Sequence, residues 1–282
     1  MKTIISPLFT RPLFLTLDLL LLAICLPACV SLEGMPGVPG MPTSAPLAFQ
    51  DLDSGSTSTT STHFTIKGYN DQDMQAISRS AEDLYNKIGN DTGLYSFMSG
   101  CNFTIVIYKD REEYMAKTHQ PATSYAVWAS SGIYLYPSPD VEPAMAFEIT
   151  RMVLNNYLGD KSAPNRWLIE GLAMFEEAAR MPESDRSAFQ SSQLTQLRAG
   201  KMPFSQMTFF VPNNTDHRRT DVWYQQVESV AGYLLNQGSP LTFAAMMSEL
   251  RGGNDIDRAI SDSYPGRFRS MIELETAWKA TT

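Results

Sequence analysis

The chain contains two adjacent segments in which apolar residues recur at helical spacing, and each segment carries one glutamate inside its apolar stripe. The first predicted helix begins near Ala144 and ends at Gly159, and its stripe consists of Ala144, Phe147, Met152, Leu154 and Tyr157. Pro164 begins the second, whose apolar side consists of Trp167, Leu168, Leu172, Ala173 and Phe175. The glutamates are Glu148 and Glu170. A carboxylate among apolar neighbours needs a partner or a chemical function, because an unpaired buried charge is costly.

Upstream of these helices, the pattern changes between strand and helix. Alternating or β-branched residues predict strands over 63–68, 102–108, 126–129 and 133–136. The last two strands form a predicted β-hairpin whose turn is Ser130, Ser131 and Gly132. Capping residues and helical spacing predict helices over 70–88 and 110–117.

Downstream, the pattern is almost entirely helical. Apolar residues at helical spacing predict helices over 184–198, 220–236, 240–250, 256–263 and 267–280. Residues 203–214 are expected to form a loop or a short strand that Phe209 and Phe210 anchor. The order of elements predicts an α+β fold in which a small mixed β-sheet is followed by a mainly helical half.

Composition fits a folded domain and argues against nucleic acid as a partner. The chain has 282 residues, of which 43% are hydrophobic, so it can bury a sizeable core. Its formal net charge is −8 and its isoelectric point is near 4.9. Nucleic-acid binding needs a basic face that neutralises phosphates, and none is visible here.

The first residues have the pattern of a secretory signal. A basic start with Lys2 and Arg11 precedes an apolar run that is short for a membrane span and contains Asp18. The tetrapeptide ending at Cys29 resembles a bacterial lipobox, which implies cleavage after residue 28 and a lipid on Cys29. The chain would then be held in the bilayer through Cys29, on the extracytoplasmic side of the cell membrane. An ordinary secretory signal with a chance cysteine is the alternative.

Residues 29–62 are rich in Gly, Pro, Ser and Thr and predict a tether. Three Gly-x-Pro triplets over 34–42 are too few for a collagen triple helix and favour a polyproline-like segment. Residues 54–62 continue it as a flexible polar run. The folded domain is therefore expected over 63–282. Of three cysteines, Cys25 leaves with the signal and Cys101 is expected to be a packed thiol, so no disulfide framework is predicted.

The second predicted helix carries a motif that resembles a known family. Residues 167–173 read W-L-I-E-G-L-A, and a helix with one central glutamate precedes them. This arrangement is similar to the core of the gluzincin metallopeptidases, and most of all to the peptidase MA-like family, in which H-E-x-x-H is followed by W-L-x-E-G-x-A. The resemblance implies that Glu148 is in the general-base position and Glu170 in the position of the third zinc ligand. The two histidine positions are occupied by Phe147 and Arg151.

The same resemblance implies where a ligand would bind. Gluzincins pair an extended substrate with the edge strand of a small sheet, and Ile133, Tyr134, Leu135 and Tyr136 occupy the corresponding place in this chain. Trp167 is a further candidate lining residue, although a core position is the plainer interpretation. Residues 221–235 resemble the helix that closes the family's site. This resemblance places Tyr224 close to the position of a family residue that can donate a hydrogen bond to the transition state.

Zinc is not expected at this motif. Phe147 offers no lone pair and Arg151 is a permanent cation, so two carboxylates alone would remain as ligands. The chain's histidines, His63, His119 and His217, have no histidine neighbour at i+3 or i+4. We therefore expect the Arg151 guanidinium to bridge Glu148 and Glu170 in place of zinc, while Phe147 fills the volume of an imidazole.

Three functions follow from these observations. The leading hypothesis is a catalytically inactive relative of zinc metallopeptidases that binds an extended peptide or an envelope protein in the former cleft. The first alternative is an active zinc metallopeptidase with atypical metal ligands and Glu148 as the general base. The second is a purely structural envelope module whose cleft Phe147 plugs.

Overall fold

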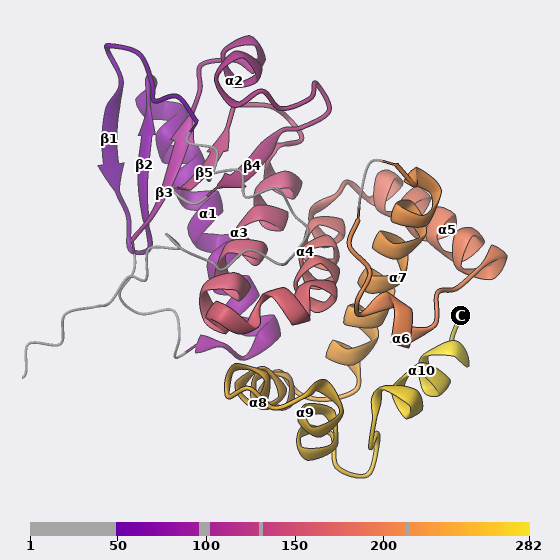
Figure 1. The fold of residues 1–282 in the computed structure, drawn as a ribbon. Coiled ribbons are helices and arrows are strands. Elements are labelled where there is room, and N and C mark those ends of the chain that lie inside the picture. Colours follow the sequence, from indigo (N-terminus) through magenta and orange to yellow (C-terminus); the bar gives the residue numbers. More distant parts are fainter. Residues whose placement is uncertain (1–48, 96–101, 130–131, 213–214) are drawn as a thin grey trace, which may run out of the picture.

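The computed structural model describes residues 49–95, 102–129, 132–212 and 215–282 (Figure 1). The predicted signal, the lipid acceptor Cys29, most of the predicted tether and Cys101 lie outside the described residues, as do Ser130 and Ser131 of the predicted turn.

Within these ranges, five strands form one mixed sheet in the order β1-β2-β3-β5-β4. The strands are β1 Thr57–Thr60, β2 Phe64–Gly68, β3 Phe103–Ile107, β4 Ala126–Ala129 and β5 Gly132–Leu135. The central pairs β2–β3 and β3–β5 are parallel, whereas β1–β2 and β4–β5 are antiparallel. The predicted hairpin over 126–136 is confirmed by the β4–β5 pair.

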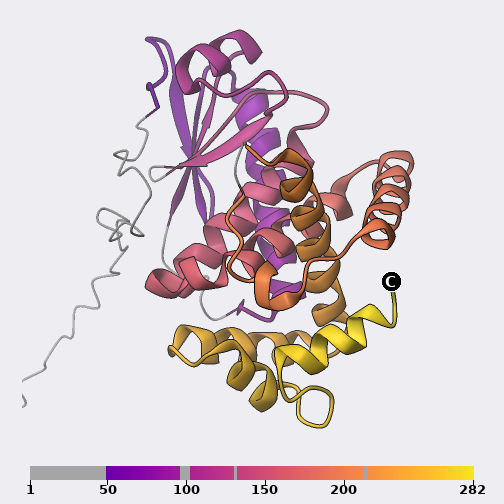
Figure 2. The same cartoon turned by 45° about the vertical axis from the view of Figure 1, so that its right-hand side comes forward.

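Of the helices that the structure describes, two lie between the strands along the chain, and the others follow the last strand. The helices are α1 Asp71–Thr92, α2 Arg111–Thr118, α3 Val141–Leu158, α4 Arg166–Arg180, α5 Glu183–Ala199, α6 Phe204–Met207, α7 His217–Asn236, α8 Pro240–Arg251, α9 Ile256–Ser263 and α10 Met271–Lys279. The α+β class predicted from the sequence is confirmed, with the sheet at one end of the molecule and α8–α10 at the other (Figure 2). No helix in these ranges is both long and apolar enough to cross a bilayer.

The helix pair α3–α4 is at the centre of the molecule and is set by local sequence. Helix α3 ends at Gly159, whose φ of 56° lies in the left-handed region that glycine adopts without steric cost. Two short 3₁₀ turns, Gly159–Lys161 and Ala163–Asn165, reverse the chain, and Pro164 lies in the second. Helix α4 then packs against α3 and against α7, which places the two predicted glutamate helices in direct contact.

The two faces of the sheet are covered differently. Helices α1 and α3 pack on one face through an aliphatic core that includes Ile66, Ile105 and Ile133. The other face carries a layer of tyrosines under α2 and under the first described residues; the buried tyrosines are Tyr108, Tyr114, Tyr134 and Tyr136. Each side of the sheet therefore has its own packed layer.

The folded unit begins earlier than the predicted residue 63. Residues 54–62 were expected as a flexible polar run, but Thr57–Thr60 form strand β1 and pair with β2. All four side chains of β1 are exposed, so the pairing depends on backbone hydrogen bonds and leaves no hydrophobic pattern. Before β1, Phe49 packs edge-on against Tyr134, and the Tyr108 hydroxyl donates a 2.7 Å hydrogen bond to the Gln50 carbonyl.

Two further expectations need correction. Residues 203–214 were expected to be a loop or short strand, but Phe204–Met207 form the single helical turn α6. Of the predicted anchor, Phe210 packs against Trp223 whereas Phe209 is 82% exposed. The two phenylalanines predicted that this segment contacts the core, but the sequence could not show which of them points inward.

We predict that Gly171→Ala destabilises the fold, although alanine is the better helix former. A Cβ atom at Gly171 would lie 2.3 Å from the Val227 carbonyl oxygen of α7, so α4 and α7 would have to separate. The expected loss is about 1–3 kcal/mol of unfolding free energy in urea denaturation. Gly200→Ala is the control, since a Cβ atom there meets nothing within 4 Å. A Gly171→Ala variant as stable as the wild type would contradict this account of the helix contact.

Candidate functional site

The glutamates of the two motif helices share one cation. Glu148 and Arg151 lie one turn apart on the same side of α3, and Glu170 faces them from α4. Arg151 Nη1 lies 2.9 Å from Glu148 Oε2, and Arg151 Nε lies 3.2 Å from Glu170 Oε1. The bridge expected from the sequence is therefore confirmed.

Burial gives this cluster its electrostatic character. The exposed fractions of the side chains are 8% for Glu148, 11% for Glu170 and 27% for Arg151. Burial raises the pKa of Glu148 to about 7, the Glu170 charge adds to the rise, and the attraction of Arg151 only partly offsets it. Burial opposes the charge of Arg151, but the two carboxylates outweigh it and raise the Arg151 pKa. Arg151 therefore stays charged throughout the physiological range.

Two aromatic rings complete the surroundings of Arg151. The centre of its guanidinium lies 5.4 Å from the Phe147 ring centroid and 5.8 Å from the Trp128 ring centroid, within cation–π range. Trp128 belongs to β4, and its backbone N–H donates a hydrogen bond to Glu148. Phe147 is half-buried and packs on the cation, so the residues at the two histidine positions of the motif that the sequence resembles contact each other.

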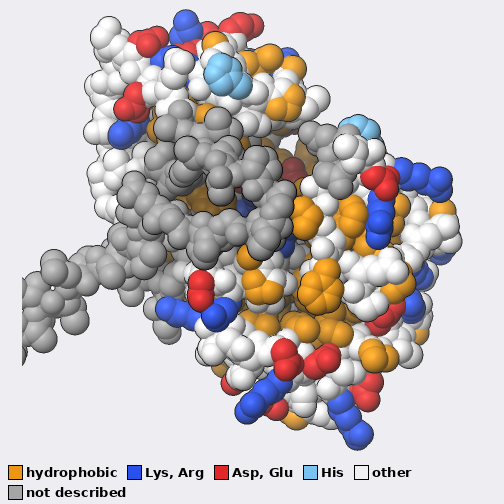
Figure 3. Space-filling model, in the orientation of Figure 1, with side chains coloured by type: hydrophobic (Ala, Val, Ile, Leu, Met, Phe, Trp, Pro, Cys, Tyr) orange, Lys and Arg blue, Asp and Glu red, His pale blue; other side chains and the backbone are white. Residues whose placement is uncertain are grey.

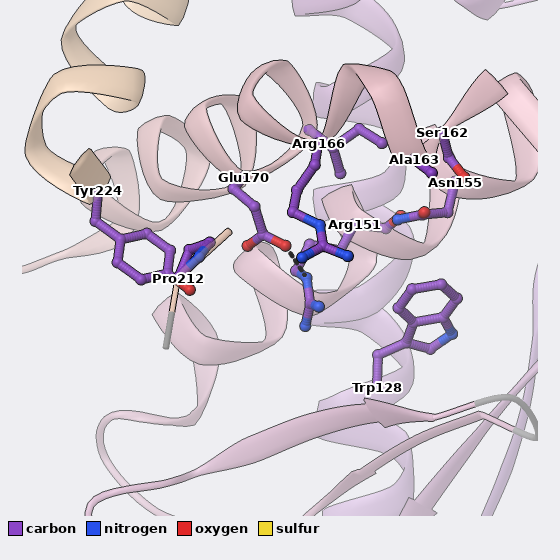
Figure 4. A pocket seen from close by; sticks show the side chains of 10 residues that line it. Trp128, Arg151, Asn155, Ser162, Ala163, Arg166, Glu170, Pro212 and Tyr224 are labelled. Carbon is purple, nitrogen blue, oxygen red and sulfur yellow. Dashed lines mark hydrogen bonds and ion pairs between the residues drawn. The ribbon is translucent and has the colours of Figure 1, made fainter. Parts of the chain in front are cut away.

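A cavity of about 320 Å³ opens beside this cluster (Figure 4). It lies between β4, the end of α3, the 3₁₀ turns, α4 and α7, and is lined by Trp128, Arg151, Asn155, Ser162, Ala163, Arg166, Ile169, Glu170, Pro212 and Tyr224. Tyr224 thus shares a cavity with Arg151 and Glu170, as its predicted role requires. Burial raises the pKa of Tyr224, and the Glu170 charge adds to the rise, so its hydroxyl keeps its proton.

Sequence reasoning missed several lining residues. Arg166 and Glu170 are four residues apart on α4, so helical spacing alone placed Arg166 one turn from the motif glutamate on the same side. Trp128 was assigned to a strand but not to the site. Pro212 and Ser162 belong to connecting segments. These segments have no periodic pattern from which their position could be predicted.

The strand predicted as the binding edge is interior. Strand β5 lies between β3 and β4, and the side chains of Ile133, Tyr134, Leu135 and Tyr136 are 0–5% exposed. The edge next to the cavity is β4, which contributes Trp128. The hydrophobic pattern identified the hairpin, but both of its strands are short and apolar, so the pattern could not show which one pairs with β3.

Trp167 is a core residue rather than a wall of this cavity. Its exposed fraction is 1%, and it borders a different hollow of about 700 Å³ between α6, α9 and α10. Phe209 and Ile272, which also line that hollow, are 82% and 76% exposed. Hydrophobic side chains gather on the lower right of the face in Figure 3. Trp167 therefore does not join Glu170 in a binding cleft.

The residues at the motif do not fit zinc. The Arg151 guanidinium occupies the space between the two carboxylates and repels a metal cation. Among the described residues, no nitrogen or sulfur donor with a lone pair takes the place of the histidines. His63 instead contacts Glu82 at 2.6 Å, His119 ends α2 and His217 begins α7. Over the described ranges, no group of three or more His, Cys, Asp or Glu side chains is arranged to hold a metal ion.

Comparison with known proteins adds no assignment. No protein-family model matches the chain, and no curated protein sequence matches it. The resemblance to peptidase MA-like proteins therefore depends on the motif residues themselves.

We predict that Arg151→Met lowers the unfolding free energy by about 3–5 kcal/mol at pH 8, because two buried carboxylates lose their shared cation. Urea denaturation followed by circular dichroism measures the loss. The triple variant Glu148→Gln, Arg151→Met, Glu170→Gln should recover most of it. Arg258→Met is the control, since its partner Asp262 is 51% exposed and the pair should contribute less than about 1 kcal/mol. Equal stability of Arg151→Met and wild type would contradict the bridge.

We also predict a pH dependence that originates at Glu148. Between its ordinary pKa near 4.5 and about 7, the folded protein keeps a proton on Glu148 that the unfolded chain has lost. The contribution of Glu148 to the unfolding free energy is therefore highest below pH 4.5. It falls by up to about 3 kcal/mol as the pH rises to 7. Burial also raises the pKa values of Glu176 and Glu177 to about 7, so the difference between wild type and Glu148→Gln isolates Glu148. A difference that does not change with pH would refute the assignment.

Proposed function

We propose that this chain is a catalytically silent relative of the gluzincin metallopeptidases, of the peptidase MA-like kind, that binds an extended peptide or an envelope protein. The observation that carries the proposal is the Arg151 guanidinium between Glu148 and Glu170. These two glutamates stand at the general-base and third-ligand positions of the motif that the sequence resembles.

The proposed loss of catalysis follows from what a guanidinium can do. Zinc binds a water molecule and lowers its pKa towards ~7, and the general base then removes its proton. A guanidinium offers no open coordination position and does not release a proton at physiological pH. Glu148 accepts hydrogen bonds from Arg151 and from the Trp128 backbone, so its carboxylate is already engaged.

Binding is supported by the cavity next to this cluster. Phe147 packs against Arg151 and leaves a volume of about 320 Å³ open, which favours a binding role over a plugged structural module. Edge strand β4 borders the cavity through Trp128. The Trp128 N–H donates to Glu148, but other backbone groups of a strand edge can pair with an extended peptide. Trp128 and Tyr224 supply flat walls suited to side-chain contact.

The proposed location comes from the N-terminal sequence. The lipobox-like residues 26–29 support a lipid on Cys29 and attachment to the outer side of the cell membrane. The peptide or envelope protein that we propose as partner would then be met outside the cytoplasm.

Zinc binding and peptide cleavage test the proposal. Wild-type protein equilibrated with zinc and a competing chelator should retain far less than one zinc ion per chain. The double variant Phe147→His, Arg151→His should retain one, because two imidazoles one turn apart would join Glu170. Stoichiometric zinc in the wild type, with peptide cleavage abolished by Glu148→Gln, would establish the metallopeptidase alternative instead.

A further inference from the structure

Hydrogen-bond donors without acceptors gather in the cavity between α3, α4 and α7. The guanidinium groups of Arg151 and Arg166 both point into it (Figure 4). Arg151 donates to the glutamates through Nε and Nη1, which leaves Nη2 without an acceptor among the described residues. Among the residues that the structure describes, Arg166 has no ion pair, and its guanidinium N–H groups donate to no protein acceptor. A half-buried guanidinium with no acceptor is an available anion site.

The charges around the cavity favour an anion. Glu148 and Glu170 each form an ion pair with Arg151, and within the described ranges neither forms one with Arg166. Arg166 therefore has no ion-pair partner of its own among the described residues, although Glu170 lines the same cavity. Arg151 and Tyr224 line the same cavity, so an anionic group bound there would also lie near their hydrogen-bond donors.

The shape and charge of the cavity favour a carboxylate over a phosphate. A planar carboxylate can accept two parallel hydrogen bonds from one guanidinium. Glu170 lines the same cavity, so a phosphate dianion would bring a second negative charge close to its carboxylate. A volume of about 320 Å³ lies at the small end of ligand sites, which suits one carboxylate and the group that carries it.

We infer that this cavity binds a carboxylate of a peptide, with the Arg166 guanidinium as its main contact. The carboxylate is either the free C-terminus or the side chain of an acidic residue. This inference rests on the proposed peptide-binding function and names the chemical group that the cleft selects. Trp128 and Tyr224 contact the apolar part of the same peptide residue.

The test compares small ligands that differ only in charge. Full-length protein is titrated calorimetrically with 3-phenylpropionate and with 3-phenylpropionamide. The acid should bind about tenfold more tightly or better, as expected for a charge-assisted hydrogen bond. Arg166→Gln should remove this preference, and Arg166→Lys should keep part of it because the charge remains without the planar fork. Arg198→Gln, at an exposed position of α5, is the control and should bind like the wild type. Thermal melts verify that each variant is folded.

A second set of titrations identifies the source of the carboxylate. N-acetyl-Ala-Ala-Phe is compared with its C-terminal amide, and N-acetyl-Ala-Glu-Phe-amide with the Gln peptide. Preference for the first acid assigns the C-terminus, and preference for the Glu peptide assigns a side chain.

Several results would overturn the inference: equal binding of acid and amide, no binding of 3-phenylpropionate, no effect of Arg166→Gln, or tighter binding of inorganic phosphate. Peptides that bind without any charge preference would preserve the proposed function and refute the carboxylate site. Binding of 3-phenylpropionate through Arg166, together with no binding of any peptide, would support the carboxylate site and refute the peptide-binding function.

Discussion

The contact of one guanidinium with carboxylates from two helices is the constraint on which the centre of this molecule depends. Arg151 and Glu148 come from α3 and Glu170 from α4, and these two helices pack directly against each other. All three side chains are largely buried, so the charges of the two carboxylates depend on Arg151 and the charge of Arg151 depends on the carboxylates. Phe147 and Trp128 shield the cation further. The cluster thus fixes the distance between the helices and one wall of the adjoining cavity.

Much of this cluster could be predicted from the sequence because its geometry is local. Residues three apart on a helix lie on one face, so Arg151 had to be within reach of Glu148. The W-L-I-E-G-L-A segment identified the second helix and placed Glu170 on its inner side. Gly171, within the same segment, allows α4 to approach the α7 backbone. Helical periodicity placed Arg151 beside Glu148, and the resemblance to the gluzincin motif indicated that Glu170 would face them.

What could not be predicted depended on pairing between distant segments. Strands β4 and β5 are both short and apolar, and only their position relative to β3 decides that β4 is the edge. Strand β1 has no apolar residue and is held by its backbone, so its sequence resembles a tether. The role of Arg166 also depends on segments that are distant in the sequence. Spacing places it beside Glu170, but whether its guanidinium finds an acceptor depends on what α3 and α7 present to it.

The position of the first described residues sets how far the domain can extend from an N-terminal attachment. Phe49 and Gln50 are bound to Tyr134 and Tyr108 on the sheet, so the chain becomes part of the fold well before residue 63. If Cys29 carries a lipid, the connecting segment ends at residue 48 and reaches at most about 70 Å, rather than about 120 Å for one that ends at residue 62. The cavity is then restricted to partners close to the membrane surface, and any pull along the connection acts directly on the tyrosine layer of the sheet.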